Sequence, residues 1–181
     1  MTKETHTRGG YIFALLALPF VYDNYLLNYN FYYKVILLII YGYFATYGAL
    51  LPDIDMRSSY ISKRFPLLYK VFGKRQKHRG FTHSLLFLGL LSLLGDLLLK
   101  LTDNNIVFTC LCCGILIGCI SHIFLDLLTK EGVELFYPLG LNFSILPIKT
   151  NSKLEKKIYK FLNLFAIFLL GYRFYMLIST K

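Results

Sequence analysis

Two residue types that bind metals occur at a helical spacing in this sequence. His122 and Asp126 lie four residues apart within a long apolar segment. On a helix, this spacing places both side chains on one face. A charged group facing lipid from such a segment costs about 2.5–3.5 kcal/mol, so the pair is expected to face a polar interior. Because imidazole nitrogen and carboxylate oxygen are ligands of zinc-like cations, the pair is a candidate for metal binding.

Five more histidine and aspartate residues could join this pair. They lie near the ends of apolar segments and are His6, Asp53, Asp55, His78 and His83. Together the seven exceed the roughly four ligands of a single zinc ion, which predicts two or more divalent ions. Zinc is the expected metal, with Mn²⁺ as the alternative. Arg79 and Lys77, beside His78, are candidates for binding a phosphate group because their side chains bind phosphate oxygens.

Several of these residues also have an ordinary interpretation. His6 could belong to a terminal tail, and Asp53 and Asp55 could simply begin a loop. Glu131 and Glu134 follow the His122 segment and could surround the site or be common loop acids. These alternatives stay open at the level of sequence.

Composition indicates a membrane protein of the all-α class. The chain has 181 residues, of which 56% are hydrophobic, and its mean hydropathy is +0.53. About 20 helical residues cover the hydrocarbon core of a bilayer. We expect a single domain over residues 1–181, a polytopic bundle with the metal-site core at about residues 5–140. The five expected transmembrane helices are 9–27, 33–51, 82–101, 106–128 and 158–178.

The distribution of basic residues predicts the orientation in the membrane. Of 20 Lys and Arg residues, 16 lie before the first expected span or in the segments after the second and the fourth. The positive-inside rule places these segments, and with them the N-terminus and the metal site, on the cytoplasmic side, and the C-terminus outside. The net charge of +10 is then explained by topology and by anionic lipid headgroups, so nucleic acid is not an expected partner.

Two loop segments are expected to lie along the membrane interface. Residues 61–73 carry apolar side chains at helical spacing among Lys and Arg, which suits an interfacial helix or, alternatively, a solvated basic loop. Residues 133–148 are apolar but are interrupted by Pro138, Gly140 and Pro147. The four cysteines all fall within residues 110–119 and are expected to be buried thiols among the helices.

Four motifs occur in a fixed order: His6 with Gly9-Gly10, LPDID at 51–55, HRGFTHS at 78–84 and SHIFLDLLTKEGV at 121–133. In this order they resemble the YdjM-like family of bacterial and archaeal membrane-bound proteins, described as metal-dependent hydrolases. That family is distantly similar to zinc-dependent phospholipase C and the fungal zinc nucleases. The resemblance implies a location in the cytoplasmic (inner) membrane. It also implies metal ligands at His6, Asp53 or Asp55, His78, His83, His122 and Asp126.

These expectations predict a membrane-embedded phosphoesterase that acts on a lipid or lipid-linked phosphate at the cytoplasmic leaflet. The expected catalytic residues are His83, Asp55 and Arg79, and an anionic phospholipid is the expected substrate partner. Two alternatives remain: a divalent-cation transporter or sensor, and a non-catalytic adaptor whose metal holds the helices together. A transporter would need polar residues across the whole membrane, whereas the other halves of the expected spans are mainly apolar.

Overall fold

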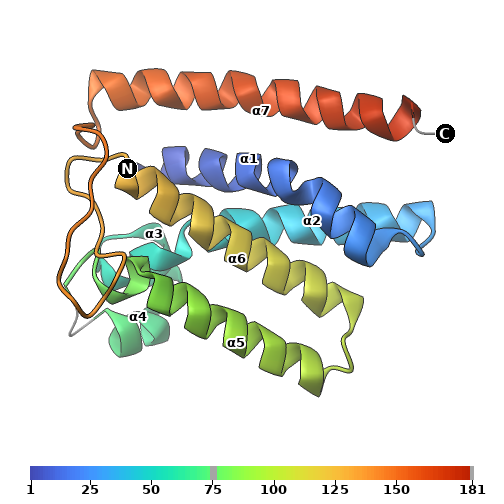
Figure 1. The fold of residues 1–181 in the computed structure, drawn as a ribbon, viewed down its shortest axis with the longest axis horizontal. Coiled ribbons are helices and arrows are strands. Elements are labelled where there is room, and N and C mark those ends of the chain that lie inside the picture. The colour runs from blue at the N-terminus through green and yellow to red at the C-terminus, as the bar shows by residue number, and fades with distance from the viewer. Residues whose placement is uncertain (74–76, 180–181) are drawn as a thin grey trace.

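The computed structural model describes residues 1–73 and 77–179, and over these ranges the chain is helical, without a β-strand (Figure 1). Five long helices run roughly side by side, with the N-terminus and the segment after α6 at one end of the bundle. The long helices are α1 (Lys3–Val21), α2 (Phe31–Gly48), α5 (Leu85–Leu101), α6 (Ile106–Leu127) and α7 (Lys153–Ser179). The all-α class predicted from the sequence is therefore confirmed.

The rest of the described chain consists of short helical segments, their connections and an irregular stretch at residues 128–152. A π-helix, η1 (Tyr22–Leu26), continues α1, and a 3-10 helix, η2 (Leu51–Asp55), follows α2. Between η2 and α5 lie α3 (Tyr60–Arg64), α4 (Pro66–Phe72) and the 3-10 helix η3 (Phe81–His83). Of these segments, η2, α3, α4 and η3 gather at the end of the bundle that also holds the N-terminus, and η1 lies at the opposite end (Figure 1).

Local sequence signals set several helix starts. The side chains of Asn30, Ser84 and Asn105 each accept a hydrogen bond from a backbone N–H in the first turn of α2, α5 and α6. Such capping satisfies donors that a helix start leaves unpaired. Ser59 caps α3 in the same way, and Pro66 occupies the first turn of α4, where a missing N–H costs nothing.

Three predicted boundaries were wrong. The first helix begins at Lys3, so His6 lies inside α1 and not in a segment that leads into it. The predicted span 82–101 divides at the cap Ser84, which places His83 on η3 before α5. The single interfacial helix expected at residues 61–73 divides at Phe65, because the residue before a proline disfavours the helical conformation.

Close packing of α2 against α6 forms the centre of the bundle. A Cβ atom on Gly118 would overlap the carbonyl oxygen of Ala45, and one on Gly114 would lie 2.5 Å from the carbonyl oxygen of Tyr41. Glycine at these positions allows the two backbones to approach as helices do in membranes. Buried Leu37, Tyr41 and Ala45 of α2 pack in the same core cluster as Cys110 of α6.

Helix α7 packs along α1 through Ile12, Leu15, Ala166 and Leu169. An unusual polar contact accompanies this packing. Pro19 has no N–H to donate to the carbonyl oxygen of Leu15 one turn earlier, and Nε of Arg173 donates to that oxygen at 3.0 Å. A cation on α7 therefore satisfies the carbonyl that proline leaves unpaired in α1.

The outer surface of the bundle carries many exposed apolar side chains. Large exposed hydrophobic side chains cover the outer faces of α2, α5 and α7, for example Ile39, Leu93 and Ile167. Judged by length and mean hydropathy alone, one described helix, α6, is suited to cross a membrane. Helix α5 has 17 residues, slightly fewer than the about 20 that cover the hydrocarbon core. The arrangement of five membrane spans therefore stays a prediction.

Candidate metal centre

Seven histidine and aspartate residues from four parts of the chain meet at one end of the bundle. Each element contributes one or two of them. They are His6 from α1, Asp53 and Asp55 from η2, His78 and His83 from the segment that includes η3, and His122 and Asp126 from α6. Six of the seven side chains are buried or partly buried, and His78 is exposed over 39% of its side chain.

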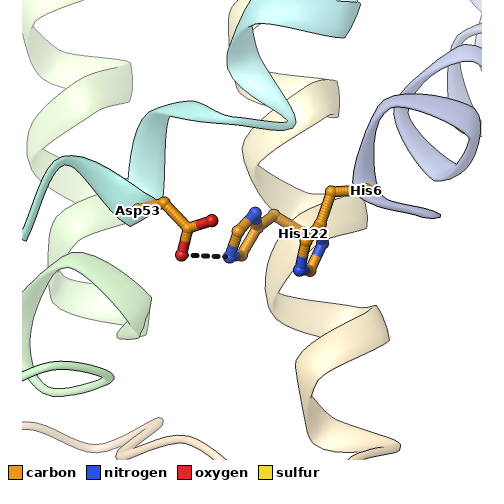
Figure 2. Close-up of side chains that lie close together, drawn as sticks. All are labelled: His6, Asp53 and His122. Atoms are coloured by element: carbon orange, nitrogen blue, oxygen red, sulfur yellow. Dashed lines mark ion pairs between the residues drawn. The ribbon is translucent and has the colours of Figure 1, made fainter. Parts of the chain in front are cut away.

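His122 lies at the centre of this cluster. Its Nδ1 lies 2.7 Å from the carbonyl oxygen of Ala49, which can only accept, so Nδ1 carries the proton and Nε2 presents a lone pair. That Nε2 is 3.6 Å from an oxygen of Asp53 (Figure 2). The ring of His6 stacks on the ring of His122 with centroids 3.7 Å apart (Figure 2).

His83 is oriented in the same manner. The hydroxyl of Thr82 donates to Asp55 at 2.8 Å, so its oxygen is left to accept from Nδ1 of His83 at 3.0 Å. The Nε2 atoms of His83 and His122 are then 3.1 Å apart, and each presents a lone pair to the other. Two donors at about 2.0–2.1 Å from a tetrahedral ion lie about 3.3 Å apart, so this separation suits a shared cation.

Asp55 orients two of the histidines, His78 directly and His83 through Thr82. Its carboxylate accepts hydrogen bonds from Nδ1 of His78 at 2.8 Å and from the backbone N–H of Arg79 at 3.0 Å, besides the bond from Thr82. Burial raises the pKa of Asp55, but the hydrogen bonds and charges of His78 and His83 outweigh it and hold the pKa well below its ordinary value. Asp55 in turn raises the pKa of His78 through their hydrogen bond.

Asp55 therefore differs from Asp53. When a carboxylate accepts a hydrogen bond from one ring nitrogen of a histidine, the other ring nitrogen is left to bind a metal. Carboxylates in this role are typical of metal sites. Among the described residues, three groups could hold an ion: His6, Asp53 and His122; Asp53, His78 and His83; and His83, His122 and Asp126. Asp55 belongs to none of these groups, and Asp53 belongs to two of them.

His6 provides an independent test of whether a metal fits. Its ring is fully buried, and neither of its nitrogen atoms has a hydrogen-bond partner. Its Nε2 is 3.3 Å from an oxygen of Asp126 without forming a hydrogen bond. Leaving a buried polar group unpaired costs about 1–3 kcal/mol, and coordination of an ion would remove that cost. The donor set and the unpaired ring both fit a divalent cation.

Arg79 and Lys77 contact acidic residues of α6 and of the segment that follows it. The guanidinium of Arg79 is 3.2 Å from an oxygen of Asp126 and 3.4 Å from one of Glu131, and it donates to the hydroxyl of Thr129 at 2.7 Å. Lys77 forms an ion pair with Glu134 at 2.7 Å. Arg79 also has a φ of 67°, a conformation that is uncommon outside glycine. Arg79 thus connects the metal-binding segments to residues 129–134.

A cavity of about 470 Å³ opens beside the donor groups. Its lining includes Asp53, His78, Lys77, Arg79 and Glu134. Candidate metal ligands and cationic side chains therefore face the same space, which is large enough for a small ligand or a headgroup. Glu131 also lines this cavity, so both Glu131 and Glu134 lie beside the candidate site.

Three groups at the site were missed by sequence reasoning. They are the hydroxyl of Thr82, the hydroxyl of Thr129 and the carbonyl of Ala49. Thr82 lies inside the HRGFTHS motif, so its position between two histidines was a usable signal. The carbonyl of Ala49 had none, because every residue has a carbonyl group.

The fold and the site define a class of protein: an all-helical chain with exposed apolar helix faces and a buried histidine–aspartate centre at one end. The chain belongs to the family described as YdjM inner membrane protein, whose model matches residues 1–179. The predicted resemblance to this family is thereby confirmed, and membership supports a location in the bacterial inner membrane.

Similarity to individual proteins agrees with this assignment. The chain is 33% identical over 182 residues to the uncharacterized protein YvsG of Bacillus subtilis (strain 168), a match that covers 100% of this chain and 99% of YvsG. It is 38% identical over 104 residues to the inner membrane protein YdjM of Escherichia coli (strain K12), which covers 58% of this chain and 52% of YdjM. YdjM of Shigella flexneri matches to the same extent. No solved structure matches the chain significantly.

Proposed function

We propose that this chain is a membrane-embedded, metal-dependent hydrolase that cleaves a phosphoester of a lipid or lipid-linked molecule at the cytoplasmic leaflet. The observation that carries the proposal is the convergence of histidine Nε2 atoms beside a cavity that also contains cationic side chains. Nδ1 of His83 and of His122 is held by Thr82 and by Ala49, and the Nε2 atoms of these two rings lie 3.1 Å apart.

In this proposal the histidines and two aspartates hold the metal. His6, His83, His122 and Asp126 would form its buried part, and Asp53 and His78 its part at the cavity. Divalent ions bound there would polarise a phosphoryl oxygen and lower the pKa of a bound water molecule. Zn²⁺ or Mn²⁺ are the expected ions, and Asp53 is placed to contact two of them because it belongs to two donor groups.

The residues around the cavity would bind the substrate. Lys77, whose side chain is 78% exposed, lies at the cavity and would attract an anionic headgroup. Arg79 would keep Asp126 and Glu131 in place, since its guanidinium already contacts both. Asp55 would act through Thr82, which contacts both Asp55 and Nδ1 of His83. This contact would orient the His83 ring so that its Nε2 binds the metal. Exposed apolar helix faces support an active end close to the membrane surface.

The test is hydrolysis by the purified protein in lipid nanodiscs. Phosphatidic acid, phosphatidylglycerol and bis-p-nitrophenyl phosphate would be supplied with Zn²⁺ or Mn²⁺, before and after chelation. We expect turnover that requires the ion and falls by about 100-fold or more in His122→Ala. Tyr41→Phe is the matched control, because it removes a buried hydrogen bond to Ala14 away from the metal residues.

Two results would contradict the proposal. Turnover that survives both chelation and His122→Ala would exclude metal-dependent catalysis at this site. Bound metal with no turnover on any substrate, together with a lower melting temperature in His122→Ala, would instead support the structural-metal alternative.

A further inference from the structure

Helices α3 and α4 form an exposed amphipathic unit beside the metal-binding turn. None of the seven residues of α4 is buried, although most of them are apolar. Leu67 is 73% exposed and Val71 is 72% exposed, and they lie one helical turn apart on the same face. Phe65 and Leu68 are each 40% exposed. A contiguous apolar surface of this kind indicates an interaction site.

All charged residues of the same unit are basic. Lys63, Arg64 and Lys70 are exposed beside these apolar side chains, and the last turn of α3 holds both Lys63 and Arg64. The sequence contains no Asp or Glu between Asp55 and Asp96. An apolar face bordered only by positive charge complements an anionic lipid surface, whose headgroups attract Lys and Arg while its acyl region accepts apolar side chains.

Contacts with η2 fix the position of this unit. The hydroxyl of Ser62 lies 3.1 Å from the carbonyl oxygen of Ile54 and 2.8 Å from that of Met56. Ile61 of α3 is buried with Ile54, and Tyr69 and Phe72 of α4 pack against this cluster. The inner face of the unit is therefore occupied by the turn that carries Asp53 and Asp55, and within the part of the chain that the structure describes the basic and apolar face is exposed.

We infer that α3 and α4 bind the surface of a bilayer containing anionic phospholipid, with Leu67 and Val71 inserted among the lipids. The position of α3 and α4 at the bilayer surface would hold η2, with Asp53 and Asp55, at the level of the lipid headgroups. This inference does not depend on catalysis, because it concerns the outer face of α3 and α4 and not the metal residues.

Single tryptophan residues give a direct test, since the chain contains no tryptophan. Leu67→Trp and Val71→Trp would be prepared separately, with Lys130→Trp as an exposed control at the same end of the bundle. Each protein would be placed in nanodiscs of phosphatidylcholine with or without phosphatidylglycerol. Quenching by brominated lipid reports contact with lipid, and quenching by acrylamide reports exposure to water.

We expect Trp fluorescence at positions 67 and 71 to be quenched by brominated lipid and shielded from acrylamide, more strongly when phosphatidylglycerol is present. Each Lys or Arg near an anionic surface favours contact by about fivefold, so Lys63→Gln with Lys70→Gln should lower the lipid-contacting fraction up to about 25-fold. Acrylamide access at both positions equal to that at position 130 would overturn the inference and favour a protein partner. Lipid contact that is indifferent to phosphatidylglycerol would overturn its anionic part.

Discussion

Asp55 determines the arrangement at the scale of single residues. It accepts hydrogen bonds from His78, Thr82 and the backbone of Arg79, and its low pKa keeps it ionised and able to accept all of them. Its neighbour Asp53, two residues away, instead belongs to two of the groups that could hold an ion. Two aspartates of one five-residue turn thus occupy different positions relative to the metal centre.

The different positions of the two aspartates predict a specific effect of Asp55→Asn. An amide cannot accept the same set of hydrogen bonds, so the rings of His78 and His83 lose their fixed orientation. We expect the affinity for Zn²⁺ to fall by about 10–100-fold while the number of ions bound at saturation is unchanged. Titration against a competing chelator measures both quantities. Asp96→Asn, in α5, is the control, and an unchanged affinity in Asp55→Asn would show that Asp55 does not orient the ligands.

At the scale of elements, the close packing of α2 against α6 also sets the position of His122 in the candidate metal centre. The carbonyl of Ala49 follows α2 and accepts a hydrogen bond from His122, and Gly118 lies one turn before His122 on α6. Any increase in the separation of these helices would therefore lengthen that hydrogen bond.

We expect Gly118→Ala to weaken both stability and metal binding. Its Cβ would overlap the carbonyl oxygen of Ala45 and lie 2.5 Å from the backbone nitrogen of Ala49. Overpacking of this kind costs about 1–3 kcal/mol. Gly89→Ala is the matched control, because nothing lies within 4 Å of a Cβ there. Thermal unfolding and zinc titration of both variants would test the coupling, and a loss of stability without any loss of affinity would disprove it.

The contact between Arg173 and α1 leads to a double-mutant prediction. Arg173→Met should destabilise the protein by about 1–3 kcal/mol, because the carbonyl of Leu15 loses its donor. In a Pro19→Ala background the backbone N–H of residue 19 can bond that carbonyl, so the same change should cost less. Melting temperatures of the four proteins in one detergent give the coupling energy. An identical cost in both backgrounds would mean that Arg173 acts independently of Pro19.

At the scale of the whole molecule, the basic segments and the candidate metal centre lie at the same end of the bundle. The N-terminus, η2, α3, α4 and the segment after α6 lie together, and the turns between α1 and α2 and between α5 and α6 lie at the opposite end (Figure 1). The basic segments identified in the sequence thus coincide with the end that carries the candidate metal centre. This agreement motivates the predicted orientation.

Reporter fusions test that orientation. We expect green fluorescent protein fused after Lys149 to fluoresce in the cytoplasm, and alkaline phosphatase fused after Asn104 or at the C-terminus to be active outside. The reciprocal fusions serve as controls and should be inactive. Active phosphatase after Lys149 would reverse the orientation, and equal activity at both positions would contradict the five-span arrangement.

Much of the helix pattern was predictable because apolar periodicity is local information. The expected span 106–128 agrees closely with α6, and the span 33–51 overlaps most of α2. The boundaries at Ser84 and Phe65 were missed, because a cap and a pre-proline residue compete with hydrophobicity over a single turn. Both errors fall near the site, where short 3-10 helices interrupt the regular pattern.

The sequence by itself determined which residues have metal-binding chemistry and that alternating helices bring them to one end. Only the tertiary structure decided which atoms meet, since His83 and His122 are 39 residues apart and His122 and Ala49 are 73 apart. Such distances depend on how closely α2 and α6 pack, and the glycines that set this spacing act through contacts with another helix. The different positions of Asp53 and Asp55, which the sequence leaves equivalent, follow from the same packing.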